Sequence, residues 1–159
     1  EKGGQWEMAL TLFDAMQQKG CEPNVITYSA AISACELSGR TLEALSLFRT
    51  AQSEGHFQSV TIKYVPEAQV DLHDLSASVA RTVVRSILQE LLELSDKDHH
   101  KAKSSVIVLE IITGRGLHSQ DGEAVLKPAI LTLFQKEYAH KYTCRVDQKN
   151  PGQLLVSTI

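Results

Sequence analysis

The chain has 159 residues, of which 43% are hydrophobic and 22% are charged, and its formal net charge is −3. This length allows one or two domains, and the composition is typical of a globular protein rather than a disordered or membrane-spanning one. The three cysteines form neither a CxxC nor a CxxH pair, which argues against a disulfide framework or a structural zinc site.

The first third of the chain contains an internal repeat. Residues 1–24 and 36–59 are identical at eight of 24 positions when they are offset by 35. The matched apolar residues fall at helical spacing, and the matched glycines fall where helices begin and end. A fixed period of this size indicates a solenoid of paired helices.

Three helices are predicted in this repeat. They span Gln5–Lys19, Ile26–Leu37 and Thr41–Ser53, and Gly20 and Gly55 end the first and the third. One complete unit and half of another cannot bury a continuous core, because about three repeats are needed. We therefore expect further repeats upstream of Glu1.

The pattern changes near Val60, and a second unit is predicted over residues 60–159. In chain order we predict strands at Val60–Val65 and Val70–His73, a helix at Ser76–Ser95 with Ser76 as its N-cap, a strand at Ser105–Thr113, a helix at Glu123–Tyr138, and closing strands at Lys141–Val146 and Gln153–Ile159. The unbroken β-branched run at Ser105–Thr113 predicts a central strand that is buried on both faces. The order β-α-β-α-β-β predicts a two-layer α/β domain with helices on one face of the sheet, after an α-helical solenoid over residues 1–59.

The segment Val70-Asp-Leu-His73 places a carboxylate and an imidazole close together. Residues i and i+2 of a strand share a face, so Asp71 and His73 are predicted to point the same way while Leu72 enters the core. Such a pair can hold a metal, activate water or move a proton. The alternative is a charged pair that caps the edge of the sheet.

A second motif, Thr113-Gly-Arg-Gly-Leu-His118, follows the predicted central strand and precedes a helix. A glycine loop of this kind presents backbone N–H groups to an anion, and Arg115 adds a positive charge. His118 is a candidate second proton donor, and the alternative is a surface histidine in a tight turn. Neither half of the chain is strongly basic, since residues 1–60 hold 4 basic and 7 acidic side chains and residues 61–159 hold 12 of each.

The segments Val25-Ile-Thr-Tyr-Ser29, Gly39-Arg40 and Glu43-Ala-Leu-x-Leu-Phe48 resemble the pentatricopeptide repeat. Repeats of this class bind single-stranded RNA, one base per unit. The resemblance implies that Ser29 and Ser59 are base-reading positions and that Asn24 closes the preceding unit. The alternative is that the two serines are a helix-start residue and a linker residue.

Val70–His73 and Thr113–Gly116 together resemble the small MutS-related (Smr) domain, with its Leu-Asp-Leu-His and Thr-Gly-x-Gly motifs. The resemblance covers Val70–Ile159, including Pro128 and the Asn150-Pro-Gly152 turn. One departure is Asp74, where this family usually has glycine or another small residue.

This resemblance implies an endonuclease site that acts on RNA or nicks DNA. Asp71 would bind a divalent metal (Mg or Mn) or activate water, His73 would transfer a proton, and Arg115 would hold the phosphate. Thr113, Gly114, Gly116 and His118 would contact nucleic acid, with no organic cofactor. A chain of this type is expected to be organellar (mitochondrion or plastid), monomeric and not membrane-bound. The alternative is a non-catalytic RNA-binding or assembly factor whose Smr domain only grips nucleic acid.

Overall fold

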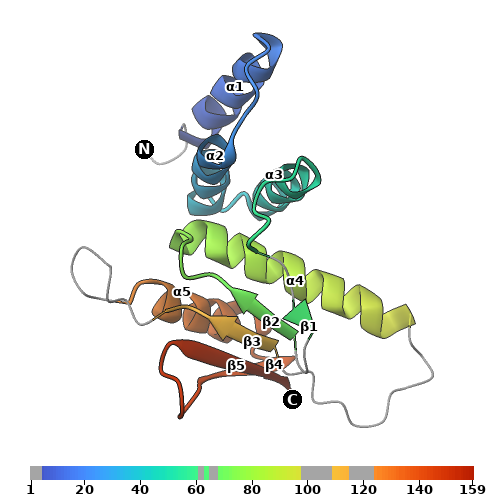
Figure 1. Cartoon of the computed structure of the whole chain (residues 1–159), viewed down its shortest axis with the longest axis vertical. Coiled ribbons are helices and arrows are strands. Elements are labelled where there is room, and N and C mark those ends of the chain that lie inside the picture. The colour runs from blue at the N-terminus through green and yellow to red at the C-terminus, as the bar shows by residue number, and fades with distance from the viewer. Residues whose placement is uncertain (1–4, 61–62, 65–67, 98–108, 115–123) are drawn as a thin grey trace.

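The computed structural model of the chain describes residues 5–60, 63–64, 68–97, 109–114 and 124–159. The helical segment consists of α1 (Gln5–Gln18), α2 (Val25–Leu37) and α3 (Thr41–Ser53), as the repeat predicted. In Figure 1, α2 and α3 lie against a long helix that separates them from the sheet.

The three repeat helices end in the same way. Gly20, Gly39 and Gly55 have φ angles of +71°, +74° and +85°, a backbone conformation that suits glycine because it has no Cβ. After each glycine, the next N–H bonds to the carbonyl five residues earlier, as in Arg40 N to Cys35 O at 2.8 Å. Among the matched glycines, Gly20, Gly39 and Gly55 are therefore helix-terminating positions.

Aromatic side chains fill the interior of the helical segment. Tyr28 is fully buried, its ring lies 4.9 Å from that of Phe13, and its hydroxyl donates to Glu54 Oε2 at 2.8 Å. Burial raises the pKa of Tyr28 to about 12, and the bond to Glu54 adds to this effect. Tyr28 is therefore a packing residue that has no surface for stacking a base.

The second part of the chain contains a mixed sheet and further helices. Its elements are β1 (Lys63–Tyr64), β2 (Ala68–Asp71), α4 (Ala77–Lys97), β3 (Leu109–Ile112), α5 (Leu126–Leu133), η1 (Phe134–Tyr138, a π-helix), β4 (Tyr142–Val146) and β5 (Gln153–Thr158). The predicted N-cap is present, because Val79 N donates to Ser76 Oγ at 3.3 Å. Pro128 is the third residue of α5, where its missing N–H disturbs no helical bond.

The five strands lie in the order β1-β2-β3-β5-β4, so β3 is central. Strands β2 and β3 are parallel, with Asp71 opposite Ile112, and the other neighbours are antiparallel. Along β3, Leu109 and Ile111 are buried, while Glu110 and Ile112 are partly exposed. The prediction of a strand buried on both faces is therefore wrong for the part of it that is described, because helices pack on one face only.

Helix α4 lies at the boundary between the two parts of the chain (Figure 1). It contacts α5 as well as α2 and α3, and in Figure 1 it lies between these two repeat helices and the sheet. The side chains that it buries are mainly aliphatic: Val79, Ala80, Val83, Val84, Ile87, Leu88 and Leu91. The buried apolar residues of the repeat and of the sheet form one continuous cluster through this helix.

A buried ion-pair cluster also crosses this boundary. Arg85 of α4 donates to both carboxylate oxygens of Glu36 in α2 at 2.8 Å, and to both oxygens of Glu137 in η1 at 2.8 and 2.6 Å. Arg81 donates to the same Glu36 at 2.9 Å. The side chains of Glu36 and Arg85 are only 4% and 9% exposed. Burial opposes the charge on Arg85, but the bonds to Glu137 and Glu36 outweigh burial and raise its pKa.

None of the described helices has both the length and the apolar character that a membrane span requires.

Candidate functional site

The two sequence motifs meet at one edge of the sheet. Because β2 and β3 are parallel neighbours, their carboxyl ends lie side by side, and Leu72 N bonds to Ile112 O at 2.8 Å just beyond the paired residues. A Cβ placed on Gly114 would lie 3.4 Å from the Cβ of His73. This edge is where ligands bind in open α/β sheets.

Asp71 and His73 form a hydrogen-bonded pair, although not in the way that the strand pattern predicted. Strand β2 ends at Asp71, and His73 lies in the following turn. Asp71 Oδ1 accepts from the backbone N–H of His73 at 3.1 Å and lies 2.6 Å from its ring Nδ1. Leu72 is fully buried between them. The turn, and not a shared strand face, therefore brings the carboxylate to the imidazole.

A second carboxylate contacts the other ring nitrogen. His73 Nε2 lies 3.1 Å from Asp74 Oδ2, and the Asp74 side chain is 86% exposed. The hydrogen bond that the His73 ring donates to Asp71 is the main cause that raises the pKa of His73, and the charges of Asp71 and Asp74 add to it. His73 itself is about half exposed. The arrangement suits a histidine that holds and transfers a proton.

Thr113 has a structural role. Its hydroxyl lies 3.2 Å from Gly152 O, its backbone N–H bonds to the same carbonyl at 2.9 Å, and the residue is 5% exposed. Its side chain is turned inwards and ties the loop to the β4–β5 turn, so Thr113 orders the loop, and its contact with nucleic acid stays a prediction. Arg115, Gly116 and His118 lie outside the described residues.

Replacing Gly114 by alanine should disturb His73 specifically. Gly114 has a φ of +71° and its missing Cβ faces His73, so we expect a loss of stability of about 1–2 kcal/mol together with a shift of the His73 ring resonances. Gly20→Ala is the matched control, because Gly20 has the same φ and nothing within 4 Å of its added Cβ. Urea unfolding and NMR of the histidine ring would measure both variants. If the two variants shift the His73 ring resonances equally, the contact between Gly114 and His73 does not influence the imidazole.

The predicted base-reading residues occupy different environments. The Asn24 side chain accepts from Ile26 N and Thr27 N and so caps α2. Ser29 is half-buried on that helix, whereas Ser59 is exposed. Ser59 lines a small hollow of about 60 Å³ together with Asp71, His73 and Asp74. The sequence placed Ser59 in the repeat and gave no sign that it borders the second motif.

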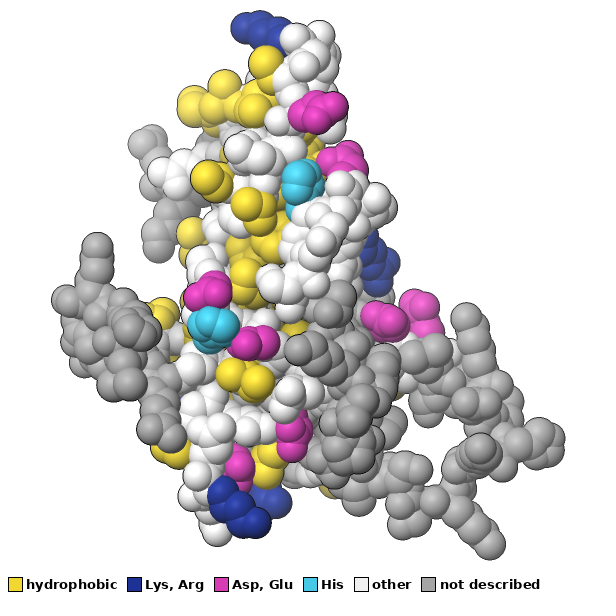
Figure 2. All heavy atoms as spheres, in the orientation of Figure 1, with side chains coloured by type: hydrophobic (Ala, Val, Ile, Leu, Met, Phe, Trp, Pro, Cys, Tyr) yellow, Lys and Arg dark blue, Asp and Glu magenta, His cyan; other side chains and the backbone are white. Residues whose placement is uncertain are grey.

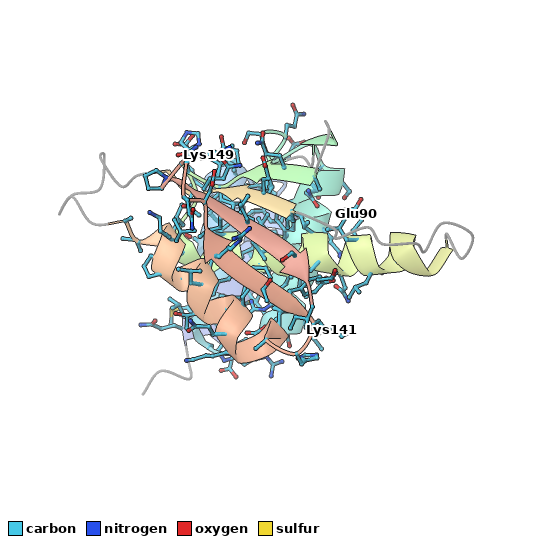
Figure 3. The ribbon with its side chains drawn as sticks, turned by 90° about the horizontal axis from the view of Figure 1, so that it is seen from below. Glu90, Lys141 and Lys149 are labelled. Carbon is cyan, nitrogen blue, oxygen red and sulfur yellow. The ribbon has the colours of Figure 1, made fainter. Side chains whose placement is uncertain are left out.

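The face shown in Figure 2 carries no continuous basic track among the described residues. On the face shown in Figure 2, acidic side chains accompany the visible histidines, and the visible Lys and Arg side chains lie towards the ends and one edge. Figure 3 places Lys141 and Lys149 at opposite ends of the β4–β5 hairpin. A continuous phosphate-binding stripe would need basic side chains that lie close together.

The donor set around Asp71 fits a divalent cation poorly. Among the residues that the structure describes, no three His, Cys, Asp or Glu side chains are arranged to hold a metal ion. The His73 ring lies between Asp71 and Asp74 and contacts both carboxylates, so the two do not converge on a common point. Mg²⁺ prefers several oxygen ligands in octahedral geometry.

Comparison with known proteins identifies the helical segment. The PPR repeat family matches residues 2–36, and the PPR repeat matches residues 26–56. Residues 2–56 are pentatricopeptide repeats. Repeats of this kind imply RNA as a partner.

Two curated proteins are similar to parts of the chain. A chloroplastic pentatricopeptide repeat-containing protein of Arabidopsis thaliana is 36% identical over 61 residues, which is 38% of this chain and 7% of that protein. NEDD4-binding protein 2 of Homo sapiens is 31% identical over 100 residues, which is 63% of this chain and 5% of that protein. The second match is too long to lie within the repeats alone. The chain spans less than a tenth of the length of either relative.

Proposed function

We propose that this chain belongs to an RNA-processing protein in which the pentatricopeptide repeats hold single-stranded RNA and the following α/β domain, of the small MutS-related type, cleaves it. The observation that carries the proposal is the meeting of Asp71, His73 and Gly114 at the carboxyl edge of two parallel strands. The chloroplastic relative supports an organellar location.

In the proposed reaction, Asp71 orients His73 and His73 transfers the proton. The 2′ oxygen of the RNA forms a bond to phosphorus and its hydroxyl proton passes to solvent. The bond from phosphorus to the 5′ oxygen breaks, and the 5′ oxygen leaves with a proton from His73 Nε2. This route needs the RNA 2′-hydroxyl, so it excludes DNA. Arg115 and the N–H groups of its glycine loop would hold the phosphate, as the family resemblance implies.

Asp74 has to move before this proton can be delivered. It contacts the same Nε2 that would face the leaving oxygen, and its side chain is mostly exposed and so is able to rotate. A bound phosphate would also repel it, because both carry negative charge. Mg or Mn at Asp71, with attack by metal-activated water, remains the competing prediction.

The test is to incubate the full chain with end-labelled single-stranded RNA in EDTA or in Mg²⁺, beside the DNA of the same sequence. We expect RNA cleavage that persists in EDTA, 2′,3′-cyclic phosphate ends, and intact DNA. Cleavage that requires Mg²⁺ and leaves ordinary phosphate ends would contradict the His73 route and return Asp71 to a metal-binding role.

A second candidate function is RNA binding without cleavage. Asp74 favours it, because this exposed carboxylate adds negative charge beside His73 in a chain whose net charge is −3. RNA that is bound but uncut in both conditions, and equally well by His73→Ala, would support this function instead.

A further inference from the structure

The end of the last repeat is held rigidly where it reaches the second domain. Phe57 has a φ of +55°, which costs a non-glycine residue about 1–3 kcal/mol unless packing enforces it. Its buried ring lies 5.5 Å from that of Phe48, and its carbonyl accepts from Val60 N at 2.9 Å. Val60 is also buried. The turn is therefore fixed on both sides of Ser59, and Ser59 itself faces solvent.

This fixed turn forms one wall of the candidate active site. Ser59 and Val60 line the same hollow as Asp71, His73 and Asp74. The hollow is small, with a volume of about 60 Å³. A nucleotide bound at Ser59 would therefore have a phosphate next to His73, because both residues line this hollow.

The repeat cannot swing away from this position without breaking buried ion pairs. The Glu36–Arg85–Glu137 cluster ties α2 to α4 and η1, and Arg49 Nη2 donates to Gln89 Oε1 at 2.9 Å between α3 and α4. Separating buried charges from their partners is strongly unfavourable. These contacts hold the last repeat, and with it Ser59, against the second domain.

We propose that Ser59 is a substrate-positioning residue that binds the nucleotide adjoining the phosphate at His73, and that the Glu36–Arg85 pair fixes this register. The proposal rests on RNA binding by the repeats, as in the proposed function. It adds that the nucleotide bound by the last repeat is next to the phosphate that lies at His73. The contact between the repeat and the second domain would then decide which phosphate of the RNA reaches the site.

The test uses the full chain and RNAs that it selects from a randomised pool. We expect Ser59→Asn to change the preferred base about tenfold at one position of the selected RNA. Ser53→Asn is the control, because Ser53 is an exposed serine of α3 outside the hollow. A photoreactive base placed at each position in turn should cross-link to residues 71–75 only from that position or its immediate neighbour.

Cross-links to residues 71–75 from positions several nucleotides away, or a preference unchanged by Ser59→Asn, would overturn the register. These readouts need no cleavage, so an RNA that is bound in register but never cut counts against the nuclease function alone. RNA that is cut at scattered positions by the wild-type chain counts against the register alone. A chain that selects no RNA contradicts both.

Whether the Glu36–Arg85 pair holds the repeat against α4 can be tested without RNA. Burial raises the pKa of Cys35, and it raises that of Cys144 to about 12, so a thiol label reacts at the exposed Cys21. A spin label on Cys21 should give one reproducible pattern of amide broadening in the wild-type chain. Glu36→Gln should weaken and spread this pattern. An identical pattern in folded Glu36→Gln would show that the ion pair does not hold the repeat in place.

Discussion

Arg85→Met should lower the free energy of unfolding by about 3–5 kcal/mol, because it leaves the buried Glu36 carboxylate without its main partner. Arg81 still contacts Glu36 but is more exposed, so it compensates only in part. Denaturation in urea, followed by circular dichroism, measures the change. The loss should be seen in helix and sheet together, since Arg85 links both parts of the fold.

Arg49→Met is the matched control for this experiment. Arg49 also crosses the boundary, through its bond to Gln89, but both side chains are exposed. Exposed polar contacts of this kind contribute about 0–1 kcal/mol. Equal losses for the two arginines would show that burial of the Glu36–Arg85 pair has no special weight.

Asp71→Asn and His73→Ala should each reduce RNA cleavage by about 100-fold or more, as is usual when a charge-stabilising group is removed. His73→Ala removes the proton donor. Asp71→Asn leaves the imidazole in place but removes the carboxylate bonded to its Nδ1 at 2.6 Å. Single-turnover cleavage of labelled RNA measures both, with His140→Ala as the control, because His140 is exposed beyond η1 and away from the hollow.

The pH dependence of the cleavage rate should distinguish Asp71→Asn from the wild-type chain. Asp71 raises the pKa of His73, so the wild-type chain should retain the imidazolium, and its activity, to higher pH than an ordinary histidine would allow. The stabilisation from this pair is present in full below the pKa of the unfolded state and is lost as pH rises through the folded pKa. Asp71→Asn should move the falling limb of the rate profile to lower pH. Full activity of Asp71→Asn at all pH values would remove the enzymatic interpretation.

The sequence predicted the elements well where local rules decide them. Gly20, Gly39 and Gly55 mark helix ends because only their backbone favours the left-handed conformation that closes each turn. Ser76 marks the start of α4 because its hydroxyl replaces a missing helical bond. Such signals lie within a few residues of their effect.

The sequence predicted part of the site, and the errors of that prediction have physical causes. The alternation rule put His73 on a strand, but the Asp71 side chain captured its N–H and ended the strand two residues early. The partnership of Glu36 with Arg85 joins residues 49 apart and depends on how α2 packs on α4, which no spacing pattern encodes. The position of Ser59 beside His73 follows from the same packing.

The π-helical turn at Phe134–Tyr138 has a consequence for how this domain tolerates changes in length. A π turn holds one residue more than an α turn, so it is equivalent to a single inserted residue. Deleting one residue there would therefore remove the extra residue and leave the flanking residues in about the same orientation. Deleting one residue from the regular turns of α5 would instead rotate everything beyond the deletion by about 100°. Glu137 would then leave Arg85, and Tyr138 would leave the aromatic group that it forms with Phe134 and Tyr142. A one-residue deletion in α5 would thus be more harmful than most substitutions, and loss of a codon there would act on the junction with the repeats from more than 60 residues away along the chain.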